Sequence, residues 1–371
     1  MRCSKLPKSK TTPDFIIVIT TLTLLAIGMI MVYSASAVWA TYKFDDAFFF
    51  AKRQLFFAGL GVVAMFIIMN VDYWTWRKHA KLLVVICFIL LVVVLIPGVG
   101  LVRGGAQSWL GVGAFSIQPS EFMKFAMIAF LAKYLSENQK KITKFKQGLL
   151  PSLSLVLLAF GLIMLQPDLG TGAVMVGTCV VMIYVSGAKL SHFVGLGMIG
   201  LAGFAALIIS APYRIKRITS FLDPWSDPLG SGFQIIQSLY AIGPGGLMGL
   251  GLGESRQKFF YLPEPQTDFI FAILSEELGF IGGTFVILLF SILLWRGIRV
   301  ALGAPDLFGS LFAVGIIGVI AIQVMINIGV VIGLMPVTGI TLPFLSYGGS
   351  SLTLMLVAVG VLLNISRYAR Y

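Results

Sequence analysis

Charged side chains are scarce in this chain of 371 residues, of which only 11% are Asp, Glu, Lys or Arg. An ordinary soluble domain carries roughly 25%, and no water-soluble fold covers its surface with so few charges. Hydrophobic residues make up 58% of the chain and the mean hydropathy is +0.96, which indicates an integral membrane protein. Because a helix needs about 20 apolar residues to cross a bilayer, this length leaves little room for a separate soluble domain.

Cysteine and histidine are also rare, and their scarcity excludes several kinds of site. Three cysteines in apolar surroundings do not make a disulfide framework. The two histidines, His79 and His192, have no cysteine or carboxylate at ligand spacing, which excludes a zinc site and a histidine base. The sequence also has no Gly-x-x-x-x-Gly-Lys-Ser/Thr loop, which argues against an ATP-driven pump. Any acid–base chemistry therefore falls to carboxylates.

Long apolar runs are abundant, and they predict an all-α integral membrane protein with about ten transmembrane helices. The runs lie at residues 15–37, 54–70, 80–97, 119–136, 148–166, 168–187, 191–211, 268–295, 308–335 and 346–365. The first run is too long for a signal peptide and has no small-residue cleavage site, so we expect it to remain as a membrane helix. We predict a single polytopic membrane domain over residues 1–371.

The basic residues sort by side of the membrane when the N-terminus is placed inside. The inner segments hold Arg2, Lys5, Lys8, Lys10, Arg77, Lys78, Lys81, Lys133, Lys140, Lys141, Lys144, Lys146, Lys189, Arg296, Arg299, Arg367 and Arg370. The outer segments hold fewer, namely Lys43, Lys52, Arg53, Arg103, Arg214, Lys216, Arg217, Arg256 and Lys258. This bias supports cytoplasmic positions for both termini. It also explains the net charge of +12 without a nucleic-acid partner.

The longest connection, at about 212–267, is predicted to be an outer loop. Arg214, Arg217, Arg256 and Lys258 lie there among aromatic residues, a composition typical of the membrane interface, where cations meet lipid phosphates. Generic headgroup contact and a specific pyrophosphate site both remain open. Residues 233–241 have amphipathic helical spacing, which predicts a helix lying on the membrane.

One carboxylate stands where this loop meets the next apolar run. Asp268 follows the sequence LPEPQT at 262–267, and we expect it in the first helical turn with Thr267 as a cap. Half-burial raises the pKa of such a carboxyl, whereas the helix N-terminus lowers it. A poised carboxylate beside a wet cavity is a candidate general base. Simple complementation of the helix dipole is the alternative.

Other charged residues are expected at membrane depth. Glu276 continues the face of Asp268 and should lie about 12 Å deeper, from a rise of roughly 1.5 Å per residue. Structural pairing and a polar cavity are both open for Glu276 and for its neighbour Glu277. Glu121 and Lys124 stand three residues apart, which predicts an ion pair on one helical face.

The sequence QPDLGTG at 166–172 separates two apolar runs without room for an ordinary loop. Proline and glycine at that depth indicate a tight turn or a broken helix lining protein or water. Asp168 either caps the next helix or binds a polar group of a substrate.

A long segment near the C-terminus resembles a family signature. Residues 327–351 read NIGVVIGLMPVTGITLPFLSYGGSS and are similar to the signature of the shape, elongation, division and sporulation family of bacterial cell-wall polymerases. The blocks QPSE at 118–121, QPDLGT at 166–171 and LPEPQTDFIF at 262–271 resemble further family blocks in the same order. The resemblance covers nearly the whole chain.

The resemblance implies a ten-helix peptidoglycan glycosyltransferase. Such an enzyme polymerises lipid II, an undecaprenyl-pyrophosphoryl disaccharide-pentapeptide, at the outer face of the cytoplasmic membrane. It works with a class B penicillin-binding protein, a transpeptidase that crosslinks the new glycan. Segments at 72–76, 214–218 and 366–371 look most like the sporulation members, which implies spore cortex synthesis around the forespore. The division members are similar enough to keep a septal role as the alternative.

The resemblance also assigns roles to residues of the matching blocks. Asp268 matches the essential acid, and Trp109 matches a functionally sensitive tryptophan of an outer loop. Glu121 and Lys124 match a pair implicated in activation. The other supporting residues are Asp168, Glu264, Ser346 and Tyr347.

Glycan extension needs a base for the acceptor hydroxyl and positive charge for the departing pyrophosphate. We expect Asp268 to be the base, or else to hold a divalent ion such as Mg²⁺ or Mn²⁺, and the outer cations to stabilise the leaving group. Two functions from other classes remain open. A lipid II flippase is favoured by the interruption at 166–172, and a scaffold would only recruit the transpeptidase.

Overall fold

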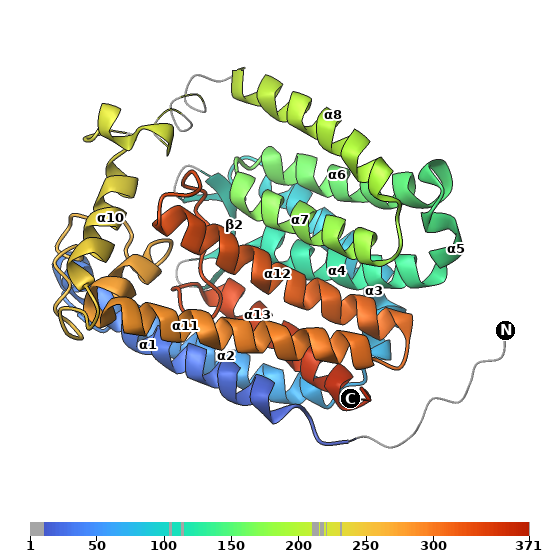
Figure 1. Ribbon diagram of the computed structural model, residues 1–371, viewed down its shortest axis with the longest axis horizontal. Coiled ribbons are helices and arrows are strands. Elements are labelled where there is room, and N and C mark those ends of the chain that lie inside the picture. The colour runs from blue at the N-terminus through green and yellow to red at the C-terminus, as the bar shows by residue number, and fades with distance from the viewer. Residues whose placement is uncertain are drawn as a thin grey trace.

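The computed structural model describes residues 11–103, 106–112, 115–209, 215, 219, 221–230 and 232–370. Within these residues, ten long helices follow the order of the predicted spans (Figure 1). They are α1 (Phe15–Phe44), α2 (Phe49–Met69), α3 (Trp74–Val94), α4 (Pro119–Glu137), α6 (Leu150–Met164), α7 (Leu169–Val185), α8 (Leu190–Ile209), α11 (Ile270–Gly303), α12 (Leu307–Val331) and α13 (Gly349–Ser366). Six spans are long and apolar enough by composition to cross a membrane. The all-α membrane bundle predicted from the sequence is confirmed.

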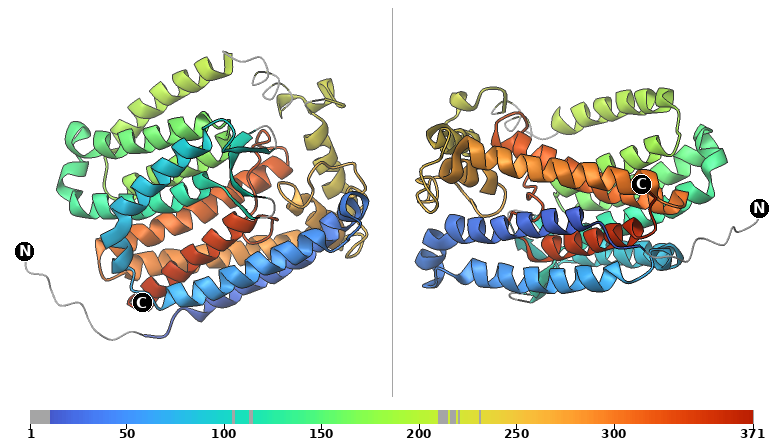
Figure 2. Two further views of the ribbon diagram at one scale, coloured as in Figure 1. Left: turned by 180° about the vertical axis from the view of Figure 1, so that it is seen from behind. Right: turned by 60° about the horizontal axis from the view of Figure 1, so that its bottom comes forward.

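The bundle is built around α12 and α13. Helix α12 packs against α4, α7 and α11, and α13 packs against α2. Figures 1 and 2 show α8 at the edge of the bundle, beyond α6 and α7. Helices α2, α3 and α11 leave many large apolar side chains exposed, as expected of helices that face lipid as well as protein.

The elements between the spans were only partly predicted. A short α5 (Gln139–Ile142) and a π-helical turn, η1 (Phe145–Leu149), precede α6, and the outer loop contains a 3₁₀ turn, η2 (Pro224–Ser226). The predicted amphipathic helix of this loop is present as α10 (Phe233–Gly245). Helix α10 packs against α11 and α12, and Ser238 Oγ donates to Val331 O at 2.7 Å. The loop is therefore fastened to the outer end of α12.

A small antiparallel sheet between α3 and α4 was not predicted. Its strands are β1 (Leu101–Arg103), β2 (Ala106–Val112) and β3 (Phe115–Ile117), in the order β1-β2-β3. Two of the three strands have only three residues each, which is too few to give an alternating pattern in the sequence. Trp109 lies on β2 opposite Leu101.

The two ends of the described chain meet at one end of the bundle (Figure 1). Thr11 N donates to Arg367 O at 2.9 Å, and Asp14 N donates to Ser366 Oγ at 3.1 Å. Asp14 also caps α1 and pairs with Arg296 at 2.6 Å. The two ends of the described chain thus lie on the same side, as an even number of spans requires.

Helix α11 is interrupted at Gly279, where φ is 66° and ψ is −164°. A β-carbon on Gly283 would lie 3.5 Å from Phe271 Cζ and 3.5 Å from Ser275 Oγ. In a continuous helix, residues 271 and 283 would be about 18 Å apart along the axis. The segment before Gly279 therefore folds back alongside the segment that follows it.

This reversal corrects the predicted depth of Glu276. Contacts with α1 show how deep each segment lies in the bundle. Ser34 of α1 donates a hydrogen bond to Glu277. Gly28, about 9 Å closer to the inner end of α1, lies against Phe344 and Leu345. The loop of Phe344 and Leu345 also contacts the backbone just before Asp268. Asp268 therefore lies deeper than Glu276, which is the reverse of the expectation. The prediction assumed one straight helix, and the sequence ELGF gave no sign that Gly279 would end it.

Candidate active site

Asp268 lies two residues before α11, at the inner tip of the folded-back segment. Phe269 occupies the N-cap position without a side-chain cap, and the Thr267 hydroxyl donates to Glu264 O at 2.9 Å. The expected cap by Thr267 is therefore wrong. The Asp268 carboxylate accepts no hydrogen bond from the residues that the structure describes, so it is free to take a proton from a bound molecule.

Burial raises the pKa of Asp268 to about 7, and the negative charge of nearby Glu264 adds to this rise. The two causes act in the same direction, because both disfavour the charged carboxylate. A carboxyl with a pKa near neutrality is ionised in part of the population and still basic enough to accept a proton. The geometry thus supplies a poised base at this position.

The backbone before Asp268 is held by the loop between α12 and α13. Ser346 Oγ donates to Thr267 O at 2.6 Å, and Tyr347 N donates to Gln266 O at 2.9 Å. Gln54 of α2 in turn donates to Ser346 O at 3.0 Å. The predicted supporting residues Ser346 and Tyr347 therefore bind the backbone of the two residues that precede Asp268.

The outer end of the folded-back segment is clamped by the two adjacent carboxylates. Glu276 accepts from the backbone N–H of Arg256 at 2.9 Å and from the Ser255 hydroxyl. Glu277 accepts from the hydroxyl of Ser34 at 2.6 Å and pairs with Lys258 at 3.3 Å. Both carboxylates are buried and bind residues of the outer loop or of α1, which indicates a structural role.

The predicted outer cations differ in their availability. Lys258 is buried against Glu277, so its ammonium faces the protein rather than the outer surface. The side chain of Arg256 is exposed. Arg214 and Arg217 lie outside the described residues. Of the predicted cations in the described part of this loop, Arg256 is the one placed to meet an anion from outside.

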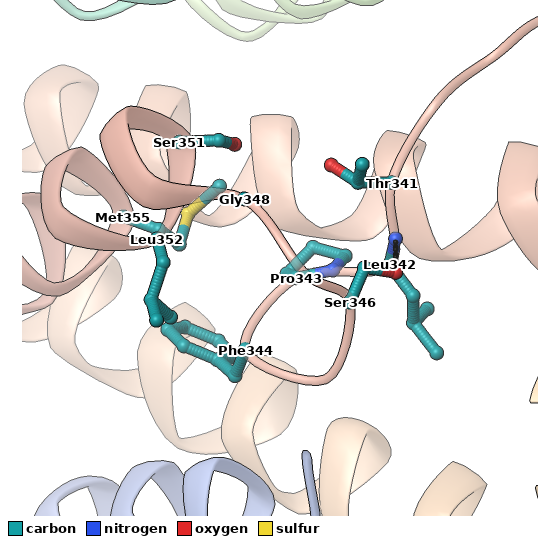
Figure 3. Close-up of a pocket in the computed structure, with 9 residues that line it drawn as sticks. All are labelled: Thr341, Leu342, Pro343, Phe344, Ser346, Gly348, Ser351, Leu352 and Met355. Carbon is teal, nitrogen blue, oxygen red and sulfur yellow. Dashed lines mark hydrogen bonds between the residues drawn. The ribbon is translucent and has the colours of Figure 1, made fainter. Parts of the chain in front are cut away.

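The predicted ion pair of α4 forms, with Lys124 Nζ 2.8 Å from Glu121 Oε1 and both side chains buried. The pair lines a narrow cavity with Ser351 and Met355 of α13. Ser351 and Met355 also line a second cavity, whose wall includes Thr341 and Ser346 of the preceding loop (Figure 3). The ion pair is thereby connected, through α13, to the loop that holds Asp268.

Figure 3 shows the hydroxyl groups of Thr341 and Ser351 pointing toward one another across the second cavity. The chain between Thr341 and Ser351 turns back sharply between Leu342 and Gly348, with Phe344 at a positive φ of 65°. Polar groups of this loop and of the first turn of α13 thus face the interior of the bundle.

Asp168 has the capping role that the sequence allowed. Its Oδ1 accepts from Thr171 N at 3.1 Å at the start of α7, and its Oδ2 accepts from Gln118 Nε2 at 2.8 Å. These bonds join the first turns of α4 and α7. The start of α7 packs on the α12–α13 loop, because a β-carbon on Gly170 would collide with Thr338 O.

A divalent ion has limited support among these side chains. In the described residues, no three His, Cys, Asp or Glu side chains gather as a metal site. Asp268 has a second acid nearby, Glu264, whose negative charge acts on it. Two carboxylates would hold a Mg²⁺ or Mn²⁺ ion only if substrate phosphates and water supplied its other ligands.

Asn327 and Gln54 were not singled out as site residues by the sequence. Both are buried amides in apolar helices, at 1% and 0% exposure. A buried amide in a membrane helix was the available signal, because it must find partners inside the protein. Their partners belong to distant segments, which the sequence pattern does not reveal.

The comparison with protein families gives one match, to the cell cycle proteins FtsW, RodA and SpoVE, over residues 15–371. Stage V sporulation protein E of Bacillus subtilis (strain 168) is 78% identical over 362 residues, covering 98% of this chain and 99% of the relative. A probable peptidoglycan glycosyltransferase FtsW of Geobacter sp. (strain M18) is 44% identical, covering 96% and 97%.

Solved structures share the fold. A chain from a peptidoglycan synthase complex, studied for its coordination of polymerization and crosslinking, superposes with a TM-score of 0.80 at 33% identity, covering 96% of this chain and 98% of that one. The rod shape determining protein RodA of Thermus thermophilus gives a TM-score of 0.71 at 30% identity, covering 96% and 97%. The resemblance found in the sequence is confirmed.

Proposed function

This chain belongs to the family of cell cycle proteins that comprises FtsW, RodA and SpoVE, and we propose from this that it is a peptidoglycan glycosyltransferase. It polymerises lipid II into glycan strands at the outer face of the cytoplasmic membrane. The observation that carries the chemistry is Asp268, a carboxylate without hydrogen-bond partners among the described residues and with a pKa of about 7. Its place in a multi-pass membrane bundle suits a substrate with a lipid tail.

Asp268 acts as the general base in this proposal. It removes the proton from the acceptor sugar hydroxyl as that oxygen attacks the anomeric carbon of the donor, and the undecaprenyl pyrophosphate leaves. A divalent ion bound at Asp268 would instead offset the charge of the pyrophosphate. We assign the exposed Arg256 to neutralisation of the leaving group, and Arg214 and Arg217 are candidates for the same role.

The remaining predicted residues act as supports. Ser346 and Tyr347 hold the backbone before Asp268. Glu121 and Lys124 form an internal pair beside α13, and we assign them to the coupling between the bundle and the site. Trp109, on the outer sheet, is assigned to contact with the substrate.

The relatives also support a proposed partner and a proposed location. We assign a class B penicillin-binding protein as partner, because the related chain of known structure belongs to a complex that joins polymerization to crosslinking. The 78% identity to a sporulation protein supports spore cortex synthesis in the membrane around the forespore. The division septum is the alternative, and both termini are assigned to the cytoplasm.

The test is polymerisation of lipid II by the purified chain together with its partner transpeptidase. We expect Asp268→Ala and Asp268→Asn to lose activity by about 10³-fold or more, a loss typical of a missing general base. Glu254→Ala is the control, because Glu254 is an exposed acid of the same loop. Normal polymerisation by Asp268→Ala would remove Asp268 from the mechanism.

A lipid II flippase is the second candidate, and interrupted helices favour it. The chain breaks at Gly279 and turns tightly at 166–168, and transporters build midplane sites from such breaks. Labelled lipid II in proteoliposomes separates the two functions. Scrambling without polymer would establish transport, whereas polymer formation that depends on Asp268 would establish the transferase.

A further inference from the structure

Three consecutive carbonyl groups ending at Asp268 each accept a hydrogen bond from the segment 327–347. Gln266 O accepts from Tyr347 N at 2.9 Å, and Thr267 O accepts from Ser346 Oγ at 2.6 Å. Asp268 O accepts from Asn327 Nδ2 at 2.8 Å. The peptide that carries the Asp268 side chain is therefore fixed at its own carbonyl by one side chain, Asn327.

Asn327 makes a second hydrogen bond, to the chain segment that faces Asp268. Its Nδ2 also donates to Ile340 O at 2.7 Å. Both partners are carbonyl oxygens, so only the NH₂ end of the amide can serve them, and the orientation of the amide follows from the chemistry. Asn327 thus ties the peptide of Asp268 to the chain at Ile340.

The residue next to Ile340 faces the Asp268 carboxylate. A β-carbon on Gly339 would lie 3.7 Å from Asp268 Oδ2, and Gly339 has a φ of 74°. The wall opposite the carboxylate is therefore backbone without a side chain. The two bonds of Asn327 set the separation between this wall and the carboxylate.

Asn327 also differs from Ser346 and Tyr347 in the element to which it belongs. It lies in α12, one turn before the helix ends at Val331, and its side chain is 1% exposed. Ser346 and Tyr347 belong to the loop before α13. Ser346 reaches helix α2 only through Gln54, whereas Asn327 joins the Asp268 carbonyl directly to a packed transmembrane helix.

We propose that Asn327 is a positioning residue that holds the Asp268 carboxylate at the backbone wall of Gly339, and this proposal rests on the function of Asp268 as the base. Asn327 does not touch the substrate. It fixes where the carboxylate meets the acceptor hydroxyl, and a reacting group displaced by about 1 Å costs on the order of 100-fold in rate.

The test compares Asn327→Ala with a matched asparagine elsewhere. Asn364 is also fully buried, donates to Met69 O at 2.9 Å and accepts from Tyr73 N at 2.9 Å, and lies near the opposite end of the bundle. With the full chain, its partner transpeptidase and lipid II, Asn327→Ala should lower kcat about 100-fold and leave KM nearly unchanged. Asn364→Ala should lower thermal stability to a similar extent and keep kcat near the unaltered value.

Two further variants keep the test decisive if Asn327→Ala folds poorly. Asn327→Asp keeps the shape of the side chain and, when protonated, donates to only one carbonyl, so it should also lose kcat with KM nearly unchanged. In an Asp268→Glu background the carboxylate is already displaced. In that background the fold-loss of kcat caused by Asn327→Asp should be less than a tenth of the fold-loss in the unaltered chain, because the effects of two substitutions that act at one point are not additive.

The outcomes separate this proposal from the proposed function. An active Asp268→Ala variant would overturn both. An inactive Asp268→Ala variant together with an unchanged kcat in Asn327→Ala and Asn327→Asp would overturn the positioning role alone. An equal loss of kcat in Asn364→Ala, or additive effects in the Asp268→Glu background, would show that Asn327 only supports the fold.

Discussion

Asp268 differs from the other buried acids of this protein in having no partner for its carboxylate among the described residues. Glu276, Glu277 and Glu121 are each held by N–H groups, hydroxyls or a lysine. These three carboxylates are occupied by their partners, whereas burial raises the pKa of Asp268, whose carboxylate has no such partners among the described residues. The environment, rather than the residue type, therefore distinguishes the base from the structural acids.

The pH dependence of polymerisation should report this environment. With a pKa of about 7, Asp268 is protonated at lower pH, so the rate should fall as the pH is lowered through about 7. Glu264→Gln removes the negative charge that raises this pKa, so the acidic limb of the pH–rate profile should move to lower pH. An unmoved limb in Glu264→Gln would assign the limb to another group.

The pair of Glu121 and Lys124 allows stability and activation to be separated. Lys124→Ala leaves a buried glutamate uncompensated, and breaking a buried pair in this way costs about 3–5 kcal/mol. The double variant Glu121→Gln and Lys124→Met should regain most of the thermal stability. If the pair serves activation, the double variant stays slow in the polymerisation assay; full activity would reduce the pair to a structural role.

At the scale of elements, the segment from Asp268 to Gly279 connects two fixed points. Its inner end is tied to α12 and the loop before α13, and its outer end is clamped to residues 255–258 by Glu276 and Glu277. The backbone at Gly279 is also bonded to the loop, since Phe280 N donates to Gly246 O at 2.9 Å. A displacement of the outer loop therefore acts on the segment that carries the base.

Removing the clamp that Lys258 and Glu277 form should lower the stability of the protein. Lys258→Ala leaves Glu277 buried without its cation, and we expect a loss of about 3–5 kcal/mol, measured as a lower denaturation temperature in detergent. The double variant Lys258→Met and Glu277→Gln should recover stability. Arg256→Ala is the control, because it removes an exposed cation of the same turn. Equal stability of Lys258→Ala and Arg256→Ala would contradict the clamp.

At the scale of the whole molecule, the charge distribution and the fold both distinguish two opposite ends of the bundle. The termini meet at one end through Thr11, Asp14 and Arg367, and the outer loop, α10 and the small sheet lie toward the other end (Figures 1 and 2). The face with the described chain ends carries most of the cations, and we predict from this bias that it faces the cytoplasm.

Cysteine labelling in intact cells tests this orientation. Leu229 is 90% exposed in the outer loop, and Lys140 lies in the inner connection before α6. An impermeant maleimide should label Leu229→Cys directly, and Lys140→Cys only after permeabilisation. Both variants are made in a Cys3→Ser background, because the sequence has a third cysteine near its N-terminus. The native Cys87 and Cys179 are buried and should stay unlabelled in both states. The opposite pattern would invert the protein and place Asp268 near the inner face.

The sequence by itself determined the membrane class, the order of the ten helices, the ion pair of Glu121 and Lys124, and Asp268 as the candidate base. These features depend on composition, on helical spacing or on a contiguous motif, all of which are local along the chain. The family resemblance was likewise carried by contiguous blocks.

Only the tertiary structure decided how the site is assembled. The reversal at Gly279 places Asp268 deeper than Glu276, commits Lys258 to Glu277 and brings Asn327 to the carbonyl of Asp268. The last two contacts join residues 19 and 59 positions apart, and the depth of Asp268 depends on contacts between residues 79 and 243 positions apart. A helix pattern fixes the spacing of residues within one segment, but the pairing of distant polar groups is decided by packing, because each buried group must find its partner there.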